Sequence, residues 1–281
     1  MLALHFQTHR FQAYFRPEFS TPFGLALMLY VQTPDTTDRS FQYGDGLFTT
    51  IKVKDGKVML WNLHLQRLVS GAKALLIHAF DTDELTHRVQ QAISASEQVI
   101  KVLISRGQAG RGYSPQGIDV PCCYISTATL PDYSLWQQQG LRLGIADFKL
   151  AQQPALAGLK HNNRLEQVLI KAELAQSGFD ELVVLDQSGA VIEVSAANLM
   201  FSKNGQWFTP KLDQAGINGV MRQHLMSQRQ VTEARYSLAD LQQADALLIC
   251  NALMGVVPVT EFAGQTKDME LVRQFVCGVE L

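Results

Sequence analysis

From Met28 onward, apolar positions alternate between the short period of strands and the longer period of helices. The segments 48–54 and 57–61 flank Asp55-Gly56, a dipeptide typical of a type I′ hairpin turn. Asn62 is expected to cap a helix, because apolar residues then recur at helical spacing up to Leu76. A second helix is predicted from about Asp83. Strands at 99–105 and 122–128, separated by the glycine-rich segment 106–120, complete the pattern of a small α+β unit.

The second half of the chain repeats this mixture with more strands. The expected elements are strands at 141–147, 182–185, 191–194 and 246–250, a helix at 163–176, a hairpin at 199–202 and 206–209 turning at Asn204-Gly205, and a capping box at Ser237–Asp240. We therefore predict a small α+β domain at 28–129, a polar linker at 130–140 and a larger domain at 141–281. A ligand site is expected between the two domains, where clefts usually form.

Residues 1–27 differ from the rest of the chain. They are rich in aromatic residues and arginine, and they show neither periodicity nor the apolar core of a secretory signal. Met28 offers an alternative start directly before the first strand. We expect this N-terminal extension to be dispensable, so that a chain beginning at Met28 keeps its melting temperature and activity.

Composition narrows the class of protein. Of the 281 residues, 47% are hydrophobic and 18% are charged, with a formal charge of -2, which excludes disorder and gives no basic excess for nucleic acid. No apolar run approaches the roughly 20 residues of a membrane span. The four cysteines form no Cys-x-x-Cys pair and the histidines are scattered, so we expect no metal site and buried thiols in a cytoplasmic protein.

A few residues could carry chemistry, and each has an ordinary structural explanation. Lys160 is either a solvated charge or a lysine at a strand end whose lowered pKa suits Schiff-base formation. Glu193 either lies on an exposed strand face or pairs with a cation such as a protonated ring nitrogen. The glycine-bearing turn 216–222 either holds a phosphate or merely starts a helix. Arg67, Arg106 and Arg111 either bind an oxyanion or are solvated.

Several segments, in order, resemble the fold-type IV pyridoxal-phosphate enzymes. They are 43–50 (YGDGLFTT), 64–68 (HLQRL), 105–113 (SRGQAGRGY), 156–167 (LAGLKHNNRLEQ), 193–199 (EVSAANL), 213–222 (DQAGINGVMR) and 250–254 (CNALM). The resemblance covers about 27–262. It implies a two-domain α+β fold, with a small domain and a larger β-barrel-like domain that hold the cofactor between them.

The resemblance also implies roles for individual residues. Lys160 matches the lysine that forms a Schiff base with pyridoxal phosphate, and Glu193 matches the carboxylate that keeps the ring nitrogen protonated. Arg67 and the backbone amides of Val220 and Met221 match the phosphate cup. The remaining matches to cofactor-binding positions are Asn198, Asn251 and Ala252.

The amino-acid sequences of these segments most resemble those of the lyases of that family that act on 4-amino-4-deoxychorismate in folate synthesis. Such an enzyme would release 4-aminobenzoate and pyruvate, with Lys160 and Thr50 as candidate proton donors. Arg111, Tyr113 and Arg106 are the expected substrate-binding residues. Related transaminases have a glutamate where this chain has Thr49, which favours a lyase.

Two alternatives remain open. One is a D-amino-acid or branched-chain aminotransferase on the same scaffold, and the other is a binding protein without activity. The family further implies a homodimer, whose ligand is a small molecule rather than nucleic acid or a membrane.

Overall fold

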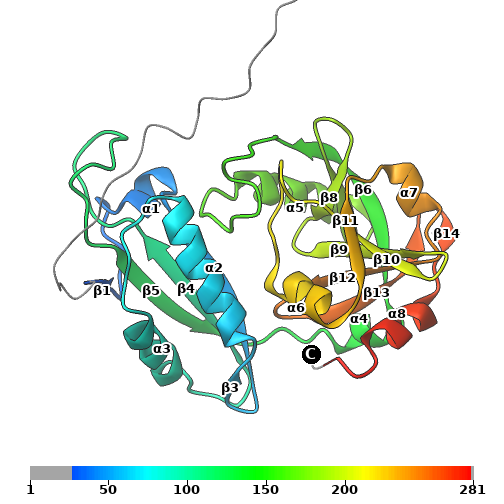
Figure 1. The fold of residues 1–281 in the computed structure, drawn as a ribbon, viewed down its shortest axis with the longest axis horizontal. Helices are drawn as coiled ribbons and strands as arrows, with labels where there is room; N and C mark the ends of the chain where they lie inside the picture. Colours follow the sequence, from blue (N-terminus) through cyan, green and yellow to red (C-terminus); the bar gives the residue numbers. More distant parts are fainter. Residues whose placement is uncertain (1–26, 280–281) are drawn as a thin grey trace, which may run out of the picture.

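The computed structural model describes residues 27–279, which form two lobes, each built on its own sheet (Figure 1). The predicted extension falls almost entirely on residues 1–26, outside the described residues, so its dispensability stays a prediction. Met28 is buried in the core of the smaller lobe, directly before the first strand.

Within the described residues, the smaller lobe contains a five-stranded sheet of order β1-β5-β4-β2-β3. Its elements are β1 (Leu29–Tyr30), α1 (Arg39–Tyr43), β2 (Gly46–Lys54), β3 (Lys57–Val58), α2 (Trp61–Ala74), α3 (Thr82–Gln91), β4 (Gln98–Ser105) and β5 (Cys122–Ala128). Alternate apolar residues of β2 and β4, such as Ile51 and Val102, pack with Leu68 of α2 and Leu85 of α3 into one core. The predicted hairpin turn is confirmed, since Asp55 and Gly56 have φ values of 51° and 69°.

The start of α2 differs from the prediction. Asn62 lies inside the helix, and Leu60 is the N-cap residue, with a left-handed φ of 52° and no side-chain hydrogen bond to the first turn. The expectation of an Asn62 cap is therefore wrong. The tight connection from β3 forces the chain to enter the helix earlier than its best capping residue.

The larger lobe contains a nine-stranded sheet in the part of the chain that the structure describes, ordered β11-β10-β9-β12-β13-β6-β7-β8 with β14 paired to β13. Its elements are α4 (Ser134–Gln139), β6 (Leu141–Leu150), α5 (Leu165–Ser177), β7 (Glu181–Asp186), β8 (Val191–Val194), β9 (Asn198–Lys203), β10 (Gln206–Pro210), α6 (Val220–Gln228), β11 (Val231–Ala234), α7 (Leu238–Gln242), β12 (Ala246–Asn251), β13 (Gly255–Phe262), β14 (Gln265–Thr266) and α8 (Met269–Val276). A bridge between Val194 and Ala197 returns the chain from β8 toward β9, so the sheet curls around its own core in the expected barrel-like manner. The capping box at Ser237 and Asp240 is confirmed.

The predicted linker contains a helix. Tyr133 and Trp136 pack against the core of the larger lobe, and the Gln137 side chain donates to the Met254 carbonyl at 2.7 Å. The segment is therefore ordered, because two aromatic residues within its polar sequence have apolar surface to bury. This segment contributes to the larger lobe.

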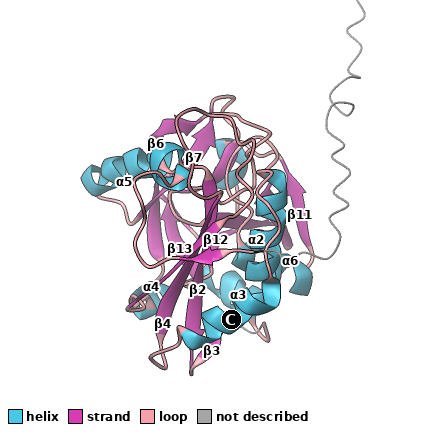
Figure 2. Ribbon diagram, turned by 90° about the vertical axis from the view of Figure 1, so that its left-hand side faces the viewer, coloured by secondary structure: helices cyan, strands magenta, loops and turns pink. Residues whose placement is uncertain are grey.

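The lobes meet along the segment that carries the candidate lysine. The N–H of Phe48 donates to the Lys160 carbonyl at 2.9 Å, and the N–H of Asn162 donates to the Gly46 carbonyl at 3.0 Å, so residues of the larger lobe lie alongside β2. Helices α2 and α6 also pack together, and Figure 2 shows them on the same side of the molecule. This junction brings residues that lie far apart in the sequence around one site.

The cysteines follow the prediction in part. Cys122, Cys123 and Cys250 are buried, whereas Cys277 is exposed, because it follows the last turn of the terminal helix α8. Within residues 27–279, no helix is long and apolar enough to cross a membrane. The same residues contain no group of three or more His, Cys, Asp or Glu side chains that could hold a metal ion.

Candidate active site

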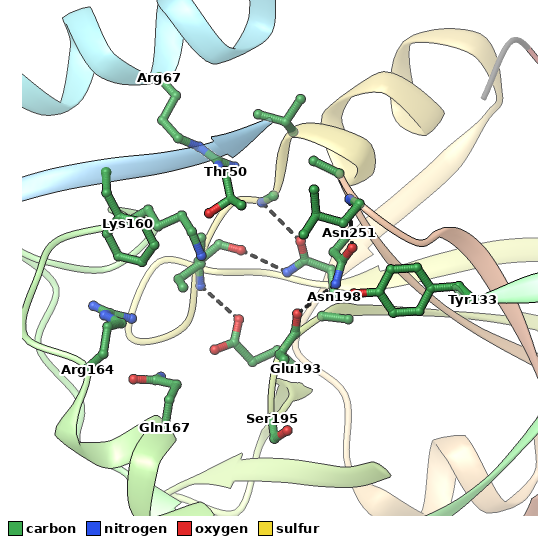
Figure 3. Close-up of a pocket in the computed structure, with 18 residues that line it drawn as sticks. Thr50, Arg67, Tyr133, Lys160, Arg164, Gln167, Glu193, Ser195, Asn198 and Asn251 are labelled. Atoms are coloured by element: carbon green, nitrogen blue, oxygen red, sulfur yellow. Dashed lines mark hydrogen bonds between the residues drawn. The ribbon is translucent and has the colours of Figure 1, made fainter. Parts of the chain in front are cut away.

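A cavity of about 370 Å³ opens at the junction of the two lobes (Figure 3). It is lined by side chains from both sheets: Phe48, Thr50, Arg67, Tyr133, Lys160, Arg164, Gln167, Glu193, Ser195, Ala196, Ala197, Asn198, Ile217, Gly219, Val220, Asn251, Ala252 and Leu253. The ionisable groups among them include three cations and one carboxylate. Such a cavity favours ligands that carry negative charge.

Lys160 lies in the loop against β2, so the expectation that it ends a strand is wrong. Its Nζ lies 4.6 Å from the centre of the Phe48 ring. Burial, together with the nearby charge of Arg67, lowers the pKa of Lys160 to about 8. A larger fraction of the amine is therefore unprotonated at neutral pH than in an exposed lysine, which suits a nucleophile that attacks a carbonyl carbon.

Glu193 lies in β8 and is 4% exposed, which excludes the exposed-face explanation. The backbone N–H of Ile217 donates to its Oε2 at 2.9 Å. Burial raises the pKa of Glu193 to about 7, and the Ile217 hydrogen bond opposes that shift. A carboxyl group so poorly solvated gains much from a cationic hydrogen-bond donor in the cavity.

Arg67 extends from α2 toward the start of α6. Its Nη2 donates to the Asn218 carbonyl at 2.9 Å, and among the described residues it forms no ion pair with a carboxylate. Helix α6 begins at Val220, next to the N-cap Gly219. A buried guanidinium beside a helix N-terminus forms a binding site for an oxyanion such as a phosphate.

Asn198 organises the loop that leads into this helix. Its Nδ2 donates to the Ile217 carbonyl at 2.8 Å, and its Oδ1 accepts the Gly219 N–H at 3.0 Å. A side chain at position 219 would collide with this same Oδ1, so a glycine is needed there. Asn198 thus lines the cavity and also fixes the backbone amides near it.

Of the other residues expected to bind the cofactor, two line the cavity and the side chain of the third does not. Asn251 and Ala252 line the cavity, and Asn251 Oδ1 accepts the N–H groups of Leu253 and Met254 at 2.9 Å. The side chain of Met221 does not line the cavity but packs into a core beneath α6. Only its backbone amide, in the first turn of α6, remains available for the predicted role.

Thr50 lines the cavity, whereas its neighbour Thr49 is fully buried behind it. Thr49 Oγ1 lies 2.6 Å from His64 Nδ1 and 3.5 Å from Arg67 Nη1. Burial, with the charges of Arg67 and Lys160, lowers the pKa of His64 to about 3, so this histidine is neutral. Thr49 and His64 therefore place neutral groups beside Arg67.

The expected substrate residues lie elsewhere. Arg111 and Tyr113 are exposed on the glycine-rich segment and do not line the cavity of this chain. Arg39 fixes that segment, because its Nη1 and Nη2 donate to the carbonyls of Gly112 and Tyr113 at 3.0 and 2.9 Å. The structure therefore gives no support within one chain for the contact predicted for these two residues.

Arg106 is buried, and its hydrogen bonds are internal. Its Nε and Nη2 donate to Asp45 at 2.7 and 3.0 Å, and its Nη1 and Nη2 donate to the carbonyls of Leu76 and Leu75. The expectation that Arg106 binds substrate is therefore wrong. The sequence places an arginine in a glycine-rich loop but does not show that Asp45 reaches it from across the sheet.

We expect Arg106→Gln to lower the free energy of unfolding by about 1–3 kcal/mol, because the largely buried Asp45 carboxylate loses the Arg106 guanidinium and keeps only Arg39, at 2.7 Å, as a cationic partner. Urea denaturation of the variant measures this loss. If the variant folds at low temperature, its KM for the substrate should equal that of the wild type. An unchanged unfolding midpoint together with a raised KM would restore the substrate-binding role.

Four polar or charged side chains of the cavity were not singled out from the sequence: Tyr133, Arg164, Gln167 and Ser195. Arg164 and Gln167 belong to the same segment as Lys160 and are spaced by one helical turn, a signal that could have placed both on one face. Tyr133 belongs to the segment predicted as a linker. Gln167 Oε1 and Ser195 Oγ are buried with no hydrogen-bond partner among residues 27–279.

Comparisons with known proteins agree with this geometry. Residues 46–262 match the family model described as amino-transferase class IV. The chain is 43% identical to an aminodeoxychorismate lyase of Vibrio harveyi, over 79% of this chain and 85% of the relative. It resembles the crystal structure of 4-amino-4-deoxychorismate lyase from Pseudomonas aeruginosa, with a TM-score of 0.83 and 33% identity, over 89% of this chain and 97% of the other.

A third structure, the PLP-bound form of a hypothetical aminotransferase from Mycobacterium tuberculosis, shares the fold at 18% identity, with a TM-score of 0.76 over 89% of this chain and 93% of that one. The family match spans both lobes and the segments that line the cavity between them. The chain belongs to the aminotransferase class IV family.

Proposed function

We propose that this protein is a pyridoxal-phosphate-dependent lyase that converts 4-amino-4-deoxychorismate into 4-aminobenzoate and pyruvate. The observation that carries the proposal is the 43% identity to a lyase of that name, shared along most of both chains. The cavity supports it, because Lys160 and Glu193 face the same space.

The cavity fits pyridoxal phosphate. We propose that Lys160 binds its carbonyl carbon, that Glu193 pairs with its ring nitrogen, and that Arg67 with the first turn of α6 holds its phosphate. The buried Glu193 carboxyl lacks a cationic hydrogen-bond donor, and Arg67 lacks an anionic partner, among the described residues. When bound, the cofactor supplies an electron sink next to the substrate amine.

The residues of the chain then divide the proton transfers. The unprotonated Lys160 amine is suited to take the proton from the amine-bearing carbon of the substrate, since its pKa is lowered to about 8. The C–O bond to the enolpyruvyl group breaks as the ring becomes aromatic. Lys160 Nζ or Thr50 Oγ1, which both line the cavity, returns a proton to carbon so that enolpyruvate becomes pyruvate.

The test is to incubate the purified protein with 4-amino-4-deoxychorismate and measure 4-aminobenzoate and pyruvate. We expect equal amounts of both products, without any added keto acid. Turnover of D-alanine or a branched-chain amino acid that depends on a keto acid, without formation of 4-aminobenzoate, would assign the chain to the aminotransferases instead. Loss of the cofactor absorbance band on borohydride treatment separates both enzymes from an inactive binding protein.

We expect Arg67→Gln to weaken the binding of pyridoxal phosphate by roughly 10- to 100-fold, because a charge-assisted hydrogen bond in a buried site is lost. The binding of pyridoxal, which has no phosphate, should change much less. Titration of the apoprotein with each compound, followed by absorbance, gives the two dissociation constants. An equal loss for both compounds would contradict a phosphate-specific role.

We also propose that the protein acts as a homodimer in the cytoplasm. Helix α5 exposes Leu165, Val168 and Leu169, whose apolar side chains a second copy could cover, and the four free cysteines suit a reducing compartment. Light scattering on the eluted protein would measure the mass in solution. A monomer at micromolar concentration would contradict the dimer.

A further inference from the structure

Arg164 is a partly buried guanidinium that faces the cavity without an anionic partner. It lies at the N-terminal end of α5, four residues after Lys160, and approaches the cavity from the same side as Lys160 (Figure 3). Among residues 27–279 it forms no ion pair. Burial lowers its pKa, an effect that the charges of Glu193 and Glu166 oppose.

His161 holds this guanidinium in place. Arg164 Nε donates to the His161 carbonyl at 2.9 Å, and its Nη2 donates to His161 Nε2. The histidine accepts here in its neutral form, and burial keeps it neutral by lowering its pKa to about 4. These bonds occupy Nε and Nη2 but leave Nη1 without a hydrogen bond to any described residue. The guanidinium is thus held by His161 through Nε and Nη2, and its Nη1 can donate to a ligand.

The balance of charges in the cavity also indicates that Arg164 is available to bind an anion. Its lining contains Arg67, Lys160 and Arg164 against the single carboxylate Glu193. In the proposed function, Arg67 binds the phosphate of the cofactor, Glu193 pairs with its ring nitrogen, and Lys160 is bonded to its carbonyl carbon. Arg164 is then the remaining cation of the lining, and leaving a partly buried charge unpaired there would be costly.

Next to Arg164 the wall of the cavity is polar. Gln167 follows it by three residues, so the two side chains lie on the same face of α5. The buried Gln167 side-chain oxygen has no hydrogen-bond partner, and no hydrogen bond to a described residue fixes the amide, so it can turn its nitrogen toward a ligand and donate. A guanidinium and an amide side by side are a donor set for an oxygen anion rather than for an apolar group.

We propose that Arg164, positioned by His161 and assisted by Gln167, binds a second oxyanion in the cavity, separate from the phosphate at Arg67. The proposal rests on the proposed function for the nature of the cavity's ligands. Two oxygen anions would be present there: a carboxylate of the substrate and the ring oxygen of the cofactor. Either would pair with the open edge of the guanidinium.

The experiment compares Arg164→Gln and Arg164→Lys with the wild-type holoenzyme in two measurements. The first is the pH titration of the absorbance of bound pyridoxal phosphate, which reports on the ring oxygen. The second is the ratio of the dissociation constants of 4-aminobenzamide and 4-aminobenzoate, measured by calorimetry, which reports on a carboxylate. Arg273→Gln is the matched control, because this arginine is 56% exposed and does not line the cavity.

We expect Arg164→Gln to change one of the two readouts, because a charge-assisted hydrogen bond is lost. The absorbance titration would shift by about one pH unit, or the ratio of dissociation constants would change by roughly tenfold. A shift of the absorbance titration assigns the ring oxygen, and a lost preference for the carboxylate assigns the substrate. The lysine variant should retain part of the effect, and the control should show none. If Arg164→Gln does not fold, Arg164→Lys is compared with the wild type by the same measurements.

Two unchanged readouts in a folded Arg164 variant would overturn the proposal and leave Arg164 with a structural role. A failure of the proposed function has a different signature. In that case the wild-type chain itself would show neither the absorbance of bound pyridoxal phosphate nor formation of 4-aminobenzoate.

Discussion

Replacing Lys160 with alanine is expected to abolish lyase activity, lowering turnover by at least roughly 10⁴-fold, because the covalent link to the cofactor and the principal proton carrier are lost together. The borohydride-trapped cofactor should disappear as well. The fold should remain, since the Lys160 amine forms no ion pair or hydrogen bond with a described residue, and its backbone carbonyl still accepts the Phe48 N–H. Circular dichroism and the melting temperature check this.

Lys101→Ala is a matched control for the cofactor readout. Its Nζ lies 4.8 Å from the centre of the same Phe48 ring, but this lysine does not line the cavity. The Lys101 variant should therefore keep the borohydride-trapped cofactor. Residual activity above a trace in a Lys160→Ala sample free of wild-type enzyme would refute the assignment of Lys160.

Local features of the fold were predictable from the sequence because their causes are local. The turn at Asp55-Gly56 and the capping box at Ser237 each depend on a few adjacent residues, and the structure confirms both. The bounds predicted for the strands 122–128 and 191–194 are those that the structure shows, since the turn residues on either side of an apolar run limit where the strand can begin and end.

The errors arise where a distant partner decides. Arg106 could be judged only by its distance to Asp45, which lies 61 positions earlier in the chain. Asn62 is a good capping residue, but the path from β3 places Leu60 at the helix start instead. In the cavity, Lys160, Glu193 and Asn198 were found through their motifs, whereas Tyr133 was missed because only the fold brings its distant segment there. Ser195 belongs to a recognised motif, but a serine in that position carries no sign of its own that it lines a cavity.

Glu193→Gln should still bind pyridoxal phosphate but lose roughly 10- to 100-fold in turnover, because a neutral amide stabilises a protonated ring nitrogen less than a carboxylate does. The substitution keeps the size of the side chain and an oxygen that accepts the Ile217 N–H. Steady-state rates with saturating cofactor measure the effect. Equal turnover in the two proteins would remove Glu193 from the proposed chemistry.

The same substitution should stabilise the apoprotein at alkaline pH. Burial raises the pKa of Glu193 in the folded state to about 7 from an ordinary 4.5, so the folded chain binds the proton more tightly than the unfolded chain does. The contribution of Glu193 to stability is therefore fully present below pH 4.5 and is lost as the pH rises to 7. Above pH 7 the ionised group opposes folding by up to about 3 kcal/mol, an unfavourable contribution that glutamine avoids.

Urea denaturation of the apoproteins tests this at pH 5 and pH 8. The Glu193→Gln variant should exceed the wild type in free energy of unfolding at pH 8, and the difference should shrink at pH 5. Glu181→Gln is the contrasting control, because this equally buried carboxylate on the neighbouring strand already pairs with Lys171 at 2.8 Å, and its loss should destabilise the protein. A Glu193→Gln apoprotein less stable than wild type at pH 8 would mean that Glu193 already has sufficient partners without a ligand. Greater stability with slower turnover would mean that this carboxylate is held in an unfavourable site until a cation enters the cavity.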